Sequence, residues 1–471
     1  MTREGRIKVA AVGYAVIVLT PLFVVLVGPG RAERGFWVEF GVALGFIGLA
    51  MLGLQSVLTA RFPRVSSSLG QDALLQFHRQ AGLVAFAFVL AHPVILLLAD
   101  GDNWEYLDLR VNFLRAAFLI IVLVALPAII VTSLWREQVH LPYEWWRLAH
   151  GALAVLIVLI GLVHIMRVQY YLSSAWKQAL WLAIGTASIG CVLYVRAIQP
   201  LRVRRRPYTV STVAEVAERT WSVTVVPDDG QVFDFRAGQF AFLTVADTPF
   251  SLEEHPFSMA SSPHRRDSIE FAVKELGDYT DRIGEIPPGS RAFVDGPYGS
   301  LQLPDDDPPG LMLVAGGIGI TPVISMVRSL SDTGSQARIV LVYANRTLDE
   351  IAYRAELETL SGQLDLTLVH VVQEPPDGWD GVTGVITPEL LDGLVPDQEA
   401  DRWWYVVCGP PPMMEAVEGS LVDLGVPIGR IESERFDIGS AGMIGRRGVG
   451  IRRTVLALSA VMLAAAALFA W

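Results

Sequence analysis

Two apolar segments of this chain each carry a pair of histidines at the same spacing. His78 and His92 lie in one segment, and His150 and His164 lie in another. Within each pair the histidines are fourteen positions apart, which on an α-helix places them on nearly the same face, about 21 Å apart along the axis. A hydrocarbon core is about 30 Å thick, so each helix would place one histidine near either side of a membrane.

Histidines inside a membrane have two interpretations. A single one is well explained as a polar residue packed against other helices, but ionisable groups in a bilayer are costly, and two matching pairs favour ligation. Imidazole is a common axial ligand of haem iron, and four imidazoles complete two six-coordinate irons. The pattern therefore predicts two metal centres, one above the other, with two stacked b-type haems as the hypothesis.

The rest of the chain divides into a membrane half and a soluble half. The first 200 residues are apolar runs joined by short loops, whereas the chain from Pro207 to Phe436 alternates as in a soluble protein. The predicted fold is thus a six-helix transmembrane haem bundle, followed by two soluble domains and an extra C-terminal transmembrane helix. The expected spans are 8–27, 36–58, 77–99, 113–134, 146–166, 175–198 and 455–471.

Basic residues predict the orientation. They collect at one set of helix ends, at Arg3, Arg6, Lys8, Arg61, Arg64, Arg136, Arg147, Arg202, Arg204, Arg205 and Arg206. The other side has an acidic loop around Asp102, although Arg31, Arg34, Arg167 and Lys177 weaken the bias. By the positive-inside rule the amino terminus and the soluble half are cytoplasmic, in a multi-pass protein of the cell membrane.

This topology sorts the histidines into pairs. The third and fifth spans run in the same direction, so His78 pairs with His150 near the cytoplasm and His92 pairs with His164 near the exterior. Arg79 and Arg147 lie at the inner end, either to bind haem propionates or to anchor the helices at the membrane surface.

Net charge argues against one class of partner, and cysteine content excludes one class of cofactor. A net charge of −11 argues against nucleic acid. The chain has only two cysteines, Cys191 and Cys408, which cannot form a four-cysteine iron–sulfur cluster.

The first part of the soluble half reads as short strands separated by glycine and proline, which is typical of a small antiparallel β-barrel. Four strands are expected, at 222–226, 240–245, 269–273 and 291–294. The motif HPFSMASSP begins at His255, and DGPYG begins at Asp295.

From Gly310 onward strands alternate with helices, which indicates a parallel sheet covered on both faces. A buried strand ends in GGIGITP, a helix is expected at 348–360, and a later strand ends in CGPPPMM. Glycines after a strand let backbone amides approach a pyrophosphate at a helix amino terminus. This turn alone is weak evidence, because it lacks the full dinucleotide fingerprint.

The combination of motifs resembles the ferredoxin–NADP reductase superfamily. With paired histidines on a six-span domain, it is similar to the NADPH oxidase and ferric reductase branch, over roughly residues 36–436. The resemblance implies that FAD is held by His255, Pro256, Phe257, Ser258, Lys274, Gly277, Asp278, Tyr279, Thr280 and Phe436. It implies that the nicotinamide nucleotide is held by Gly316, Gly317, Gly319, Thr321, Pro322, Arg346, Cys408, Gly409 and Pro410, and that Ser258, Cys408 and Phe436 lie at the reacting rings.

Arg346 bears on the choice of nucleotide. It follows Asn345 at the expected end of the second strand of the nucleotide domain, where an arginine suits the 2′-phosphate of NADP and no acidic residue is present to bind a free ribose hydroxyl. NADPH is therefore favoured, and NADH stays open.

The expected domains are 1–200 (haem), 207–305 (FAD), 308–436 (nucleotide), 437–453 (a basic glycine-rich linker) and 454–471 (the last helix, a membrane tether or the contact for a protein partner). The resemblance implies an enzyme that passes electrons from NAD(P)H through FAD and two haems to an acceptor outside the cytoplasm, with oxygen, giving superoxide, as the first choice. The alternatives are a ferric or cupric chelate reductase, a cytochrome b subunit that donates to a protein or quinone, and a membrane-anchored flavin reductase without haem.

Overall fold

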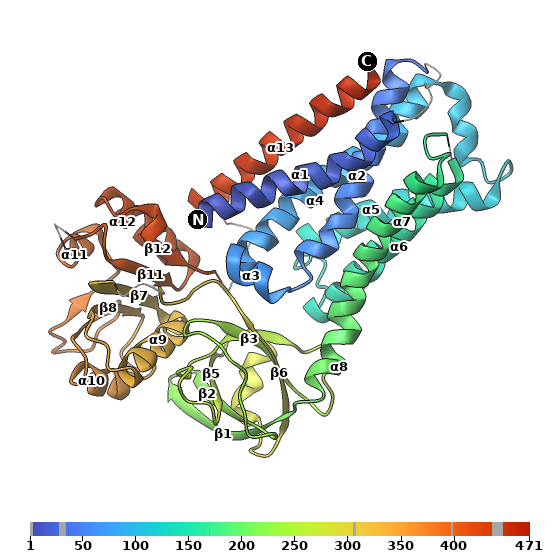
Figure 1. The fold of residues 1–471 in the computed structure, drawn as a ribbon. Coiled ribbons are helices and arrows are strands. Elements are labelled where there is room, and N and C mark those ends of the chain that lie inside the picture. Colours follow the sequence, from blue (N-terminus) through green and yellow to red (C-terminus); the bar gives the residue numbers. More distant parts are fainter. Residues whose placement is uncertain (1–2, 28–33, 169, 305–307, 397–398, 436–445) are drawn as a thin grey trace.

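The computed structural model describes residues 3–27, 34–168, 170–304, 308–396, 399–435 and 446–471. Within these ranges seven helices are long and apolar enough to cross a membrane. The protein is therefore a multi-pass membrane protein with two soluble domains at one end of the helix bundle (Figure 1). The seven helices are α1 (Arg3–Leu26), α2 (Phe36–Leu58), α4 (Gln71–Ala99), α5 (Phe113–Leu134), α6 (Tyr143–Val168), α7 (Ala175–Leu193) and α13 (Arg446–Ala470).

Small residues on α2 let this helix approach α4 closely. A Cβ atom built at Gly48 would lie 2.6 Å from Val89 Cγ2, and one at Gly41 would lie 3.1 Å from Ile95 Cγ2. Close backbone approach at small residues is a common basis of helix packing in membranes, where no hydrophobic effect drives association. The α2–α4 contact thus fixes the helix that carries His78 and His92.

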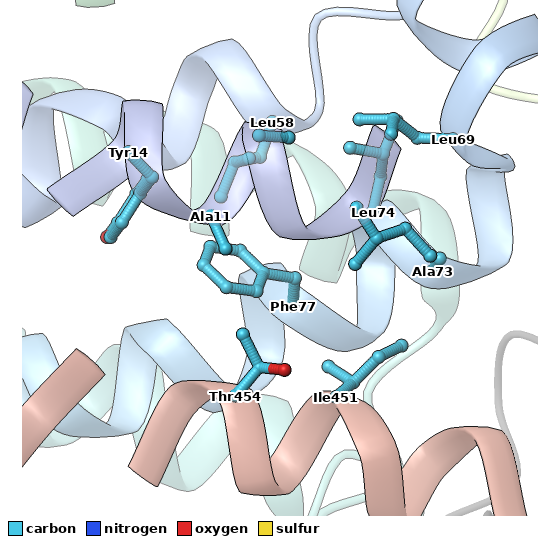
Figure 2. Close-up of a pocket in the computed structure, with 11 residues that line it drawn as sticks. Ala11, Tyr14, Leu58, Leu69, Ala73, Leu74, Phe77, Ile451 and Thr454 are labelled. Atoms are coloured by element: carbon cyan, nitrogen blue, oxygen red, sulfur yellow. The ribbon is translucent and has the colours of Figure 1, made fainter. Parts of the chain in front are cut away.

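The extra helix α13 packs along α1, α2 and α4, and ends far from the soluble domains (Figure 1). Near its amino end a small apolar pocket of about 70 Å³ lies between α1, α4 and α13, with Ala11, Phe77 and Ile451 in its wall (Figure 2). The helix begins at Arg446, so part of the linker expected at 437–453 is helical.

Four short elements either join successive membrane helices or continue α7 toward the first soluble domain. They are α3 (Pro63–Leu69), η1 (Gly101–Leu107), η2 (Tyr194–Ile198) and α8 (Gln199–Val203). The elements η2 and α8 follow α7 without a break, and α8 leads to the first strand of the soluble domain. No element was expected at 63–69, where a proline at the first helical position begins a short helix.

The first soluble domain is an antiparallel half-barrel, as expected. Its strands lie in the order β4-β3-β6-β1-β2-β5, around a core that includes Val223, Leu243 and Phe271. The strands are β1 (Tyr208–Ala217), β2 (Thr220–Pro227), β3 (Phe240–Val245), β4 (His255–Ser258), β5 (Ile269–Lys274) and β6 (Arg291–Tyr298), with η3 (Thr280–Glu285) after β5. Strand β1 was not among the four expected strands.

The second soluble domain is the expected parallel sheet, with strand order β10-β9-β8-β7-β11-β12. Its elements are β7 (Gly310–Gly316), η4 (Gly317–Gly319), α9 (Ile320–Asp332), β8 (Arg338–Asn345), α10 (Arg354–Ser361), β9 (Leu366–Val372), β10 (Val382–Thr383), α11 (Pro388–Asp392), β11 (Trp404–Cys408), α12 (Pro411–Asp423), η5 (Ile428–Arg430) and β12 (Ile431–Ser433). The helix expected at 348–360 begins later, at Arg354, because Tyr353 adopts a left-handed backbone conformation with φ of 59°.

Candidate functional site

The four histidines form two facing pairs between α4 and α6. The ring centroids of His78 and His150 are 6.3 Å apart with an interplanar angle of 56°, and those of His92 and His164 are 6.3 Å apart with an angle of 69°. Helix α4 packs chiefly on α2, whereas α6 packs on α5 and α7. The facing rings therefore lie between two helices that have their main contacts elsewhere. The partners are those that the topology predicts.

The ring spacing fits a metal ion between each pair. A first-row metal ion bonds an imidazole nitrogen at about 2.0 Å, so two imidazoles on opposite sides of one ion have centroids roughly 6 Å apart. Among the residues that the structure describes, no group of three or more His, Cys, Asp or Glu side chains is placed to hold a metal. Each pair offers two ligands, the number that a six-coordinate haem iron takes from the protein.

Polar groups orient three of the four rings. The Nδ1 atom of His92 lies 2.9 Å from the Gly41 carbonyl oxygen, and that of His150 lies 3.2 Å from the Ser133 hydroxyl. The side-chain amide of Gln55 lies 2.6 Å from Nδ1 of His78. Metal-bound histidines commonly donate their second ring N–H to an oxygen acceptor, and the Gly41 carbonyl and the Ser133 hydroxyl can accept in this way from His92 and His150. At His78 the direction is reversed, because the amide nitrogen of Gln55 donates to Nδ1.

The two arginines expected at the inner end differ. Arg79 is exposed. The guanidinium of Arg147 donates to Glu254 Oε2 at 3.0 Å and to the Leu252 carbonyl at 2.9 Å. Arg147 therefore binds the half-barrel, a role that neither propionate binding nor simple surface anchoring had suggested.

The HPFS motif forms the edge strand β4 of the half-barrel. Pro256 donates no backbone hydrogen bond, which suits an edge position. The ring of His255 stacks on Tyr279 with centroids 4.0 Å apart, and its buried Nε2 atom has no hydrogen-bond partner. Burial lowers the pKa of His255, so the ring is a neutral platform with one free polar atom. These features suit a flavin, and Ser258, buried at the end of the strand, lies in the same motif.

The residues expected at the FAD pyrophosphate lie on the same domain. Thr280 accepts a hydrogen bond from the backbone of Leu276 at 2.8 Å and donates to the Gly277 carbonyl at 3.0 Å, which closes the turn that contains Asp278. Lys274, however, forms an ion pair with Glu350 of the second domain at 2.7 Å. This lysine joins the two soluble domains, and a pyrophosphate would compete with Glu350 for it.

The two glycine motifs of the nucleotide domain meet at the carboxyl ends of β7 and β11. A Cβ atom at Gly319 would lie 2.3 Å from the Cys408 carbonyl, and one at Gly316 would lie 2.5 Å from Met413 Sδ. Gly317 has a φ of 51°, and a Cβ atom there would meet nothing within 4 Å. Packing therefore requires glycine at positions 316 and 319. Gly317 instead leaves open space at the amino end of α9, where an anion is favoured.

The remaining expected nucleotide contacts surround this point. Thr321 and Pro322 are buried in the first turn of α9, and Gly409 and Pro410 follow Cys408 at the end of β11. Burial, with Glu434 nearby, raises the pKa of Cys408 to about 12, so its sulfur is a neutral thiol. Phe436, the expected aromatic partner of the flavin, lies outside the described residues.

Arg346 ends up beside an acidic residue. Its Nε atom lies 3.1 Å from Glu374 Oε1, and both side chains are more than 60% exposed. Such an exposed pair is weak, so a phosphate could replace Glu374 as the partner of Arg346.

Sequence reasoning missed the charged joint between the half-barrel and the nucleotide domain. Arg328 of α9 donates to Glu270 of β5 at 2.7 Å and makes two bonds to Glu356 of α10, at 2.6 and 2.7 Å. Burial acts to raise the pKa of Glu270, but Arg328 and hydrogen bonds from Tyr353 and Ser222 outweigh it and lower that pKa. No sequence motif marks these residues.

Three family descriptions match the chain: "Ferric reductase like transmembrane component" at residues 44–161, "FAD-binding domain" at 205–302 and "Oxidoreductase NAD-binding domain" at 313–419. The fold and these matches define a membrane oxidoreductase with FAD-binding and NAD-binding domains. The chain belongs to the NADPH oxidase and ferric reductase superfamily, in which a ferric reductase transmembrane domain is fused to these two domains.

Individual relatives share less of the chain. NADH-cytochrome b5 reductase 1 of Laccaria bicolor is 30% identical over 177 residues, 36% of this chain and 58% of that protein. The propane 2-monooxygenase reductase component of Mycolicibacterium goodii is 31% identical over 226 residues, 46% of this chain and 63% of that protein. The chain thus spans about three fifths of the length of these relatives. A flavohemoglobin structure from Malassezia yamatoensis covers 82% of this chain and 98% of its own, at 17% identity and a TM-score of 0.45.

Proposed function

We propose that this protein is a transmembrane NAD(P)H oxidoreductase that passes electrons from the cytoplasm, through FAD and two stacked b-type haems, to an acceptor on the other side. The observation that carries the proposal is the pair of facing histidine sites at one spacing, 6.3 Å, in a bundle attached to FAD-binding and NAD-binding domains. His78 and His150 would hold the inner haem, and His92 and His164 would hold the outer one.

The arrangement of the two pairs supports a direction of flow. The inner pair lies near the amino ends of α4 and α6, and the amino end of α6 contacts the half-barrel through Arg147. The basic residues Arg61, Arg147 and Arg202 lie at this end, which the positive-inside rule assigns to the cytoplasm. Electrons would therefore enter at the inner pair and leave at the outer pair.

Oxygen is the acceptor that we favour. Each NAD(P)H supplies two electrons as a hydride, and two oxygen molecules would each accept one, which yields two superoxide ions, NAD(P)⁺ and one proton. If histidines fill both axial positions of the iron, oxygen would react at the haem edge. NADPH is the favoured nucleotide, because Arg346 can exchange Glu374 for a 2′-phosphate.

The test is anaerobic reduction followed by a choice of acceptors. Purified protein mixed with NADPH should show reduced b-type bands, and oxygen should then reoxidise the haems and form superoxide. If only ferric citrate reoxidises them, the protein is a metal chelate reductase. A dithionite-reduced spectrum without b-type bands would contradict the proposal, and replacing Arg346 with Ala should raise the KM for NADPH more than that for NADH.

A further inference from the structure

A cluster of charged side chains joins the membrane helices to the half-barrel. Arg61, in the loop after α2, donates to Glu254 Oε1 at 2.9 Å, and Arg147 of α6 donates to Glu254 Oε2 at 3.0 Å. Asp295 of β6 lies 4.0 Å from Arg61. All four side chains are at most 22% exposed, so one carboxylate is held between two arginines and a second lies beside them.

Further contacts hold Arg61 and Arg147 in place. The backbone of Arg61 has a φ of 52°, in the left-handed region that side chains other than glycine disfavour. Its guanidinium lies 3.6 Å from the centre of the Phe242 ring on β3, and the carbonyl of Arg147 accepts a hydrogen bond from Arg196 at 3.2 Å. A conformation of this kind persists when surrounding contacts impose it.

The position of this cluster relates the flavin motif to the inner histidine pair. Glu254 directly precedes His255, the first residue of β4, and Arg147 lies three residues, or about one helical turn, before His150. On the barrel side, Asp295 also accepts hydrogen bonds from Gln199 of α8 at 2.5 Å and from Tyr298 at 2.9 Å. The chain thus has a short polar connection from the flavin strand to the helix that carries His150.

We propose that Arg61 and Arg147 are positioning residues for electron transfer from the flavin to the inner metal centre. By binding Glu254 they fix β4 against the inner end of α6, which sets the separation between donor and acceptor. Electron transfer slows steeply as that separation grows, whereas hydride transfer within the two soluble domains does not depend on it. This inference rests on the proposed function.

The test compares two adjacent glutamates in the full-length protein. Glu254→Gln removes the charge between the two arginines. Glu253→Gln is the matched control, because Glu253 pairs only loosely, at 3.5 Å, with the exposed Arg282. After anaerobic mixing with NADPH, Glu254→Gln should slow haem reduction at least tenfold while flavin reduction keeps its rate. Glu253→Gln should leave both rates unchanged.

Hydrogen exchange gives a readout independent of turnover. Amides of residues 252–258 should exchange faster in Glu254→Gln than in Glu253→Gln or the unchanged protein. Arg61→Lys keeps the positive charge at this position, so amide exchange and the rate of haem reduction should be intermediate. This variant replaces Glu254→Gln in the test if Glu254→Gln fails to fold. Unchanged haem reduction and unchanged exchange in the Glu254 and Arg61 variants would overturn the inference, as would an equal slowing of flavin and haem reduction. If the unchanged protein fails to reduce haem with NADPH, the proposed function fails, and the exchange data still decide whether the arginines hold β4.

Discussion

The inner and outer histidine pairs share one ring spacing but differ in what holds their rings. At the outer pair, His92 is bound by the backbone carbonyl of Gly41, and a Cβ atom at Gly45 would lie 2.8 Å from its Nδ1. At the inner pair, His78 and His150 are bound by the side chains of Gln55 and Ser133. The ring of His92 is thus fixed by backbone and packing, whereas the rings of the inner pair are open to adjustment by side-chain substitution.

The largest expected effect is the loss of one centre. Replacing His92 with Leu removes a ligand nitrogen, so the haem content should fall from two to one per FAD in a haem assay, and NADPH should still reduce the haem that remains. His264→Leu is the control, because His264 is exposed on the half-barrel and should keep both haems. Full haem content in the His92 variant would show that the outer ligand is assigned wrongly.

A smaller effect should come from crowding one pair alone. Gly45→Ala places a methyl group 2.8 Å from His92 Nδ1, and overpacking of this kind destabilises by about 1–3 kcal/mol. Thermal unfolding should shift downward, with partial loss of the outer haem. Gly82→Ala is the matched control near the inner pair, where the added atom would lie 3.9 Å from Gln55 Oε1, an ordinary contact. Equal effects of the two substitutions would remove the distinction between the pairs.

The inner pair should respond to its hydroxyl partner. Ser133→Ala removes the group that orients His150, and loss of such a partner lowers metal affinity by about tenfold at the low end of its range. Haem transfer to an excess of apomyoglobin measures this change. The inner haem should leave faster than in the unchanged protein, and the outer haem should leave at its usual rate.

The smallest expected effect is a pH dependence confined to the inner pair. Burial acts to raise the pKa of Glu254, but Arg61 and Arg147 outweigh it and lower that pKa below 4.5. Glu254 therefore stabilises the contact between the membrane helices and the half-barrel fully above pH 4.5. This stabilisation is lost as the pH falls through the lower pKa that Glu254 has in the folded protein. Burial raises the pKa of the neighbouring Asp295.

Acid titration of the haem spectra checks this prediction. The inner haem band should shift reversibly as Glu254 becomes neutral, and the outer band should not. Glu254→Gln should abolish the shift. A shift of equal size at both haems would contradict the placement of the cluster of Arg61, Arg147 and Glu254 beside the inner pair.

The sequence predicted most of the elements and the partners within each histidine pair. Fixed spacing on helices of known pitch and alternating strand patterns carry that information locally. The charged joints were missed, because Arg61 and Glu254 are separated by 193 positions and Arg147 and Glu254 by 107. The strand character of HPFS was also missed, since its pairing with β3 is set by the tertiary fold, and no local pattern indicated that Lys274 would bind Glu350.

The most direct test of the central claim is the haem content and coordination of the purified protein. We expect two b-type haems per FAD, both six-coordinate and low-spin in the oxidised electron paramagnetic resonance spectrum, as two histidine ligands per iron require. A protein with no haem, or with one haem that is five-coordinate and high-spin, would contradict it.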